Sequence, residues 1–229
     1  MLLEVIATTV DDAVIAERHG ADRIELITGI REGGLTPSLG LIEGVREAVR
    51  IPVRVMVRPH ARSFCYDEAD AQTMLRDIRH IAAVGGLSLV MGMLRPDGKV
   101  DEELLKRLLQ AADGLEVTFH RAFDEAEDQL AALETISRYP QITDILTSGG
   151  QNTAPEGAER IAVLERLSAS VNILAGSGLT AEGLSDFITD TAVSRVHFGS
   201  AVREGGDPLK PIDPARLQAV RSILNSGKR

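Results

Sequence analysis

Short β-forming runs alternate with helical runs along the whole chain, and this repeat constrains the fold more than any other feature. The expected strands cover residues 2–6, 22–27, 52–57, 86–91, 115–119, 143–147, 171–174 and 195–198. The expected helices cover residues 10–19, 40–49, 67–84, 101–112, 130–138, 157–167, 181–188 and 214–224. Strands that alternate with helices in this way predict an α/β protein with a parallel sheet.

The number of units favours a closed barrel over an open sheet. The 229 residues hold eight units of about 28 residues each, which matches a (β/α)₈ barrel. A doubly wound open sheet is the alternative, and its first strand usually leads into G-x-G-x-x-G. Here the first run leads into Ala7, Thr8 and Thr9 instead. We therefore predict a single TIM-barrel domain over residues 1–229.

Helix starts can be predicted from polar residues with short side chains. Ser38, Asp101 and Thr180 each precede a helical run and are expected to cap it, because their side-chain oxygens accept hydrogen bonds from the first free N–H groups. Asp124 is expected to cap the helix that follows the fifth strand.

The composition excludes several function classes. The net charge of −9 and the pI of about 5.1 argue against binding to nucleic acids or anionic membranes. No apolar run is long enough for a membrane-spanning helix. Cys65 is the single cysteine, which fits a reducing compartment. We therefore expect a cytoplasmic protein without nucleic-acid or membrane partners.

Side-chain alternation along the strands predicts a charged barrel interior. Residues two apart share a face of a strand, and the apolar set suits the layer between barrel and helices. The charged or polar set then faces inward and includes Glu4, Arg23, Glu25, Arg54, Arg58, Thr118, His120, Arg195 and His197. Buried charges are costly unless paired, so these residues either fill the barrel as salt bridges or form a site. Arg58 and His120, near the strand ends, favour a site, whereas Arg54 and Arg195 favour a structural role.

These residue types predict acid–base chemistry on an anionic ligand. Glu4 and Glu25 are the candidate general acid and base, and His120 is a candidate proton shuttle near neutral pH. Guanidinium groups and Gly-Ser loops at barrel strand ends bind carboxylates and phosphates. The candidate ligand-binding residues are Arg23, Arg58, Arg121, Thr147, Ser148, Gly149, Gly176, Ser177, His197 and Ser200. The residues thus predict an isomerase, lyase or hydrolase acting on a small anionic or phosphorylated metabolite.

Several strings resemble the CutC family, whose members are usually described as copper-homeostasis proteins. They include GADRIEL at 20–26, GGLTPS at 33–38 and TFHRAFD at 118–124, and further matches extend from residue 3 to residue 198. The resemblance implies a TIM barrel, a cytoplasmic location, self-association into a homo-oligomer, and copper binding or control of intracellular copper. The candidate copper ligands are Cys65, His60, His120 and His197.

The chain departs from the family pattern at two strand ends. Many members carry cysteines directly after the first two strands, and this chain has Ile6 and Ile27 there. After Arg58, many members have a glycine-rich stretch with an acidic residue, whereas this chain has His60, Ala61 and Arg62. The residues alone contain no cysteine pair and no His-x-x-x-His spacing that would indicate a metal site. A copper ion and a small anionic metabolite are therefore alternative ligands.

Overall fold

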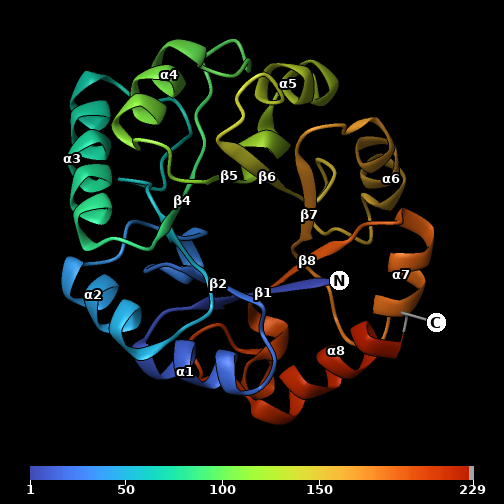
Figure 1. The fold of residues 1–229 in the computed structure, drawn as a ribbon. Coiled ribbons are helices and arrows are strands. Elements are labelled where there is room, and N and C mark those ends of the chain that lie inside the picture. The colour runs from blue at the N-terminus through green and yellow to red at the C-terminus, as the bar shows by residue number, and fades with distance from the viewer. Residues whose placement is uncertain (227–229) are drawn as a thin grey trace.

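Eight parallel strands close into a barrel in the computed structural model, which describes residues 1–226 (Figure 1). Each strand pairs with its neighbours in sequence, and β8 pairs with β1 to close the sheet. The strands are β1 Leu2–Ala7, β2 Arg23–Leu26, β3 Val53–Met56, β4 Ser88–Met91, β5 Val117–Phe119, β6 Ile142–Thr147, β7 Asn172–Gly176 and β8 Arg195–Phe198. The predicted (β/α)₈ barrel is confirmed.

The helices form a ring outside the barrel (Figure 1). They are α1 Val10–Arg18, α2 Leu39–Ala48, α3 Glu68–Val84, α4 Glu102–Ala111, α5 Gln129–Ile136, α6 Ala158–Leu167, α7 Leu184–Thr191 and α8 Pro214–Ser226. Short 3₁₀ helices lie at Ile30–Glu32 (η1), Arg121–Glu125 (η2), Ser200–Val202 (η3) and Glu204–Gly206 (η4), all after the C-terminal ends of strands. Within residues 1–226, every helix is too short or too polar to cross a membrane.

Two of the four helix caps proposed from the sequence are confirmed. Ser38 accepts a hydrogen bond from the N–H of Leu41, and Asp101 accepts one from the N–H of Leu104. The prediction for Thr180 is wrong, because α7 begins only after Gly183, which provides no side-chain cap.

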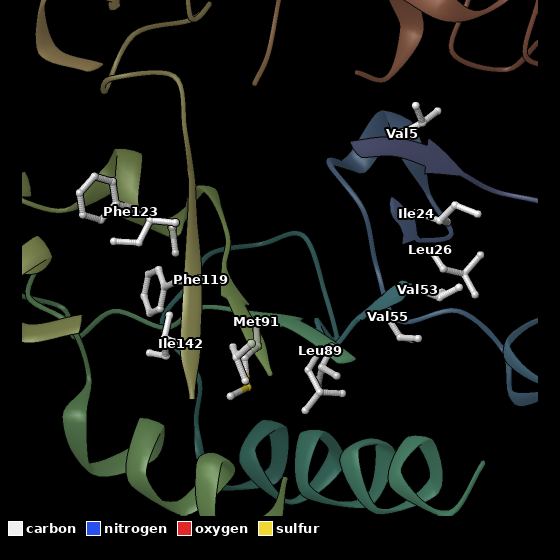
Figure 2. Packing of buried hydrophobic residues seen from close by; sticks show 14 of the residues in the cluster. Val5, Ile24, Leu26, Val53, Val55, Leu89, Met91, Phe119, Phe123 and Ile142 are labelled. Atoms are coloured by element: carbon white, nitrogen blue, oxygen red, sulfur yellow. The ribbon is translucent and has the colours of Figure 1, made fainter. Parts of the chain in front are cut away.

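A continuous apolar layer separates the barrel from the helices. Alternate residues of each strand point outward into it, and Figure 2 shows Leu89 and Met91 of β4 turned toward the neighbouring helices. Leu89, Met91 and Phe119 are fully buried, and each such side chain stabilises the fold by roughly 1.5–3 kcal/mol. This layer holds the strands in the register that positions the inward-facing residues.

The strand register brings charged residues from distant parts of the sequence together inside the barrel. Glu4 of β1 lies beside Arg23 of β2 on one side and beside His197 of β8 on the other. Glu25 lies beside Arg54 of β3. The predicted inward orientation of these residues is therefore observed, and all five are buried.

Candidate functional site

The N-terminal half of the barrel interior holds a salt-bridge layer centred on Asp144 of β6. One carboxylate oxygen of this fully buried residue lies 3.2 Å from Arg23 Nη1 and 2.9 Å from Arg54 Nη2. The other lies 2.8 Å from Arg195 Nη1. A buried carboxylate surrounded by guanidinium groups is stable because its charge is paired. The layer includes Arg54 and Arg195, for which the sequence predicts a structural role. It also includes Arg23, which was predicted to bind a ligand.

Glu4, Glu25 and His197 form a compact cluster next to this layer. Glu4 is ion-paired with the Nε of Arg23 and accepts a 2.8 Å hydrogen bond from the Nδ1 of His197. Glu25 Oε2 lies 3.8 Å from the Nε2 of His197, which is too long for a hydrogen bond. Among residues 1–226, Glu25 Oε1 has no hydrogen-bond partner. The ligand atoms of the three side chains lie within 4.8 Å of one another, so the cluster could hold a metal ion.

The surroundings move the pKa values of the two carboxyl groups apart. Burial raises the pKa of Glu25 to about 7, against the attraction of His197 and with the help of the Glu4 carboxylate. Burial acts on Glu4 in the same direction, but Arg23 and the hydrogen bond from His197 outweigh it and lower that pKa to about 2. Burial disfavours the charged form of His197, yet Glu25 and Glu4 outweigh burial and raise its pKa. Glu25 can therefore gain or lose a proton near neutral pH while Glu4 stays ionised.

A cavity of about 740 Å³ opens at the C-terminal end of the barrel and is lined by Glu25 and His197. Much of its remaining wall is apolar, with contributions from Ile6, Ile27 and Met56. A concave site of a few hundred Å³ with a few convergent polar groups is typical of small-molecule binding. The C-terminal face is also where TIM-barrel enzymes place their active sites.

Arg58, Phe64 and His120 form another part of the cavity wall. The guanidinium carbon of Arg58 lies 4.6 Å from the centroid of the Phe64 ring, and its Nη1 donates to the carbonyl oxygen of Glu32 at 2.9 Å. The ring centroid of His120 lies 4.8 Å from that of Phe64. Burial and the nearby charge of Arg58 lower the pKa of His120 to about 3. The ring is therefore neutral at pH 7, which argues against the proton-shuttle role expected from the sequence.

The loop after β6, predicted as an anion site, binds a carboxylate of its own chain. Asp124 of η2 accepts hydrogen bonds from the hydroxyls of Thr147 and Ser148 and from the N–H groups of Ser148 and Gly150. Gly149 donates its N–H to the Thr147 hydroxyl. Arg121 joins the same network through a 2.7 Å contact with Asp124. The N–H and hydroxyl donors of this loop are therefore occupied by Asp124. The prediction that Asp124 caps the next helix is wrong, because Asp128 caps α5.

The predicted residues after β7 and β8 lie at or beside the cavity. Gly176 packs against the barrel interior, since an added Cβ would lie 2.7 Å from Leu146 Cδ1 and 3.1 Å from His197. The Ser177 hydroxyl donates to the carbonyl oxygen of Asn152 at 2.8 Å. Ser177 and Ser200 both line the cavity.

The structure does not gather the four candidate copper ligands into one group. His60 pairs with Asp70 of α3 at 3.0 Å, and Cys65 lies partly exposed in the loop between β3 and α3. His120 and His197 line the cavity, which Cys65 and His60 do not. Within residues 1–226, the compact group suited to a metal ion is Glu4, Glu25 and His197. The sequence prediction included His197 in a metal set but assigned the two carboxyls to catalysis.

Comparison with known proteins identifies the relatives of this barrel. The sequence matches the CutC family over residues 1–202. The chain belongs to the CutC family. It is 39% identical over 207 residues to the human copper homeostasis protein cutC homolog, covering 90% of this chain and 76% of the relative. It is 41% identical over 201 residues to a CutC family protein of Erwinia tasmaniensis, covering 88% and 79%.

Solved structures agree with this assignment. A CutC structure from Streptococcus agalactiae superposes with a TM-score of 0.80 at 30% identity, over 86% of this chain and 97% of that one. Phosphoribosyl anthranilate isomerase from Thermococcus kodakaraensis superposes with a TM-score of 0.63 at 18% identity, over 99% of both chains. The second likeness shows the shared barrel fold alone.

This CutC chain lines its cavity with isoleucine at the C-terminal ends of β1 and β2. Ile27 packs with Met56 and Val90, and Ile6 and Ile30 pack against that group. Ile6 and Ile27 thus give the cavity an apolar wall next to Glu25, and neither can ligate a metal.

Proposed function

We propose that this CutC-family protein binds a small anionic metabolite in the barrel-mouth cavity and converts it by proton transfer. The observation that carries the proposal is Glu25, a carboxyl group on the cavity wall with one unpartnered oxygen and a pKa of about 7. A general base works best when its pKa lies near the working pH. His197, held through Nδ1 by the ionised Glu4, faces Glu25 and can exchange a proton with it.

Arg58 supports an anionic ligand. This residue lines the cavity, and its Nη1 is fixed by backbone carbonyls. Its buried Nε has no hydrogen-bond partner within residues 1–226. A rigid guanidinium with an unused N–H is suited to a ligand oxygen that carries negative charge. Isomerisation and lyase-type cleavage are the reaction classes that need such a pairing of a base with an anion clamp.

Copper binding is the second candidate function, because the family implies it and the cluster of Glu4, Glu25 and His197 is compact. The donor set does not fit Cu(I), which prefers thiolate and thioether ligands. Glu4 is moreover already paired with Arg23. The version of copper binding that these residues could support is therefore a divalent ion held by oxygen and nitrogen donors. A cytoplasmic location and self-association are further predictions from the family.

A thermal-shift screen tests the main proposal. The panel consists of sugar phosphates, phosphorylated carboxylic acids and hydroxy acids, with Cu(II), Zn(II) and reductant-stabilised Cu(I) as separate arms. A ligand at about 100 times its dissociation constant stabilises the folded protein by about 2.7 kcal/mol. We expect an anionic metabolite to raise the melting temperature of the wild type and to lose this effect in Arg58→Gln.

The control variant is Arg62→Gln, which removes an exposed guanidinium from the same β3–α3 loop outside the cavity. It is expected to respond like the wild type. If no metabolite stabilises the protein, or if Arg58→Gln responds as the wild type does, the proposal is wrong. A shift with Cu(II) or Zn(II) that disappears in Glu25→Gln would instead favour the metal-binding candidate.

A further inference from the structure

His120 presents one polar atom that has no hydrogen-bond partner in the part of the chain that the structure describes. The backbone N–H of Ala122 donates to its Nδ1 at 3.1 Å, so Nδ1 is an acceptor and carries no proton. In a neutral imidazole the proton must then lie on Nε2. That Nε2 is buried without a hydrogen-bond partner, on a side chain that is only 3% exposed and lines the cavity. A buried donor without a partner destabilises the fold, so its presence in the cavity wall indicates a position where a ligand atom binds.

The ring of His120 is held rigidly in this orientation. Gly92 makes room for it, since a Cβ at that position would lie 2.6 Å from Nδ1 and 2.8 Å from Cε1. Phe64 and Phe119 pack against the ring with centroids 4.8 Å and 6.3 Å away. A fixed donor stabilises charge better than a mobile one, because it needs no reorganisation during the reaction.

Arg58 provides a second donor on the same wall. Its Nε is buried and unpartnered like the Nε2 of His120, and both residues line the cavity. Glu25 projects from β2, and His120 follows β5, with β3 and β4 between them around the barrel. The cavity therefore has a basic carboxylate on one wall and two unused N–H donors on another.

We propose that the ligand is a carbonyl compound with an acidic C–H next to the carbonyl, such as a hydroxyaldehyde or hydroxyketone, and that His120 and Arg58 bind its oxygen. In the step, the Glu25 carboxylate takes the proton from the carbon beside the carbonyl. The C–H electron pair forms a C=C bond, and the carbonyl π electrons move to oxygen, which becomes an enolate. His120 and Arg58 donate hydrogen bonds to that oxygen. When Glu25 returns the proton to the same carbon, the C=C electron pair forms the new C–H bond and an oxygen electron pair re-forms the carbonyl.

The assignment rests on the proposed function, since it names the substrate class of the same cavity. A neutral imidazole donor facing a carboxylate base is a suitable pairing for enolisation, because the donor stabilises the enolate without giving up its proton. An alcohol or a saturated acid would leave both donors without a developing negative charge to stabilise.

Hydrogen–deuterium exchange tests the assignment. Hydroxyaldehydes and hydroxyketones of three to six carbons, free and phosphorylated, are incubated in D₂O, each with its matching alcohol as a control. Proton NMR then follows loss of the signal from the carbon beside the carbonyl. The full chain is compared with Glu25→Gln, His120→Phe and His120→Gln, and with His80→Asn, which changes an exposed histidine on α3.

We expect exchange for at least one carbonyl compound with the wild type and with His80→Asn, and none with Glu25→Gln. Removal of a single donor to a developing oxyanion slows reactions by about 100-fold or more, so His120→Phe should lose at least this factor. His120→Gln retains an N–H donor and should recover part of the rate, which separates hydrogen bonding from a packing role.

Either of two results would contradict the assignment of a carbonyl substrate without contradicting the proposed function. One is exchange that is as fast in His120→Phe as in the wild type. The other is stabilisation of the protein by phosphorylated alcohols with no exchange of any carbonyl compound. Absence of stabilisation by every compound would instead reject the proposed function itself. Nitrogen-15 NMR of the histidines provides a check without a ligand. His120 is expected to show one neutral Nε2–H form from pH 5 to pH 8, and titration within that range would contradict the assignment.

Discussion

Glu25→Gln removes a buried ionisable group, and its effect on stability depends on pH. Burial raises the pKa of Glu25 from 4.5 to about 7. The folded protein therefore keeps this proton up to about pH 7, whereas the unfolded chain loses it near pH 4.5. Stability is lost as pH rises through this window, because the unfolded state binds fewer protons than the folded state. One pKa unit corresponds to about 1.4 kcal/mol, so the wild type loses roughly 3 kcal/mol between pH 4.5 and pH 8.

Glu25→Gln should lack this loss of stability with rising pH. His197 acts in the same direction, since its raised pKa also removes stability as pH increases, and part of that rise comes from Glu25. Any cost of burying the glutamine amide is the same at all pH values. The free energy of unfolding of Glu25→Gln, relative to the wild type, is therefore expected to increase by roughly 3 kcal/mol between pH 4.5 and pH 8.

Urea unfolding followed by circular dichroism at pH 4.5, 5.5, 6.5 and 8 measures this difference. Glu182→Gln, which changes an exposed carboxyl group on the same rim of the barrel, is the control and should show no such increase. A constant difference between Glu25→Gln and the wild type across these pH values would refute the reasoning about Glu25.

Three further predictions follow from close contacts around the cavity. Gly92→Ala places a Cβ 2.6 Å from the Nδ1 of His120, so we expect a loss of about 1–3 kcal/mol in chemical denaturation and a changed nitrogen-15 shift of that ring. Asp124→Ala leaves the donors of the β6 loop unpaired and should destabilise the protein by about 3–5 kcal/mol, whereas a loss under 1 kcal/mol would show that the network is not needed. The double variant Ile6→Cys with Ile27→Cys adds two thiols to the cavity wall and should gain Cu(I) affinity in competition with a coloured chelator; an affinity equal to that of the parent would contradict this.

The barrel could be predicted from the sequence because two local signals agree. The strand and helix periods alternate eight times, and in β1, β2, β3 and β8 charged residues alternate with apolar ones. The same alternation predicted that Glu4, Glu25 and His197 point inward. Asp144 shares a strand face with Leu146, but an isolated acidic residue in an apolar strand does not indicate which arginines pair with it, because Arg54 and Arg195 lie far away in the sequence.

The groups that bind to the loop donors could not be predicted from strand alternation. Thr147, Ser148 and Gly149 have the composition of an anion site, and the sequence does not reveal that the anion is Asp124, which precedes Ser148 by 24 residues in the chain. The protonation of His120 likewise depends on burial and on Arg58, which only the packed structure brings together. Local patterns indicate which groups are present, whereas tertiary contacts decide whether those groups are free.

Carbon-13 NMR of the glutamate side-chain carboxyls tests the central claim most directly. The protein is labelled at the glutamate carboxyl carbons and titrated from pH 3 to pH 9, and the Glu25 signal is assigned by its absence from Glu25→Gln. The account predicts that this signal titrates near pH 7, as expected for a buried carboxyl poised for proton transfer at neutral pH. A Glu25 signal that titrates near the ordinary value of 4.5 would contradict it.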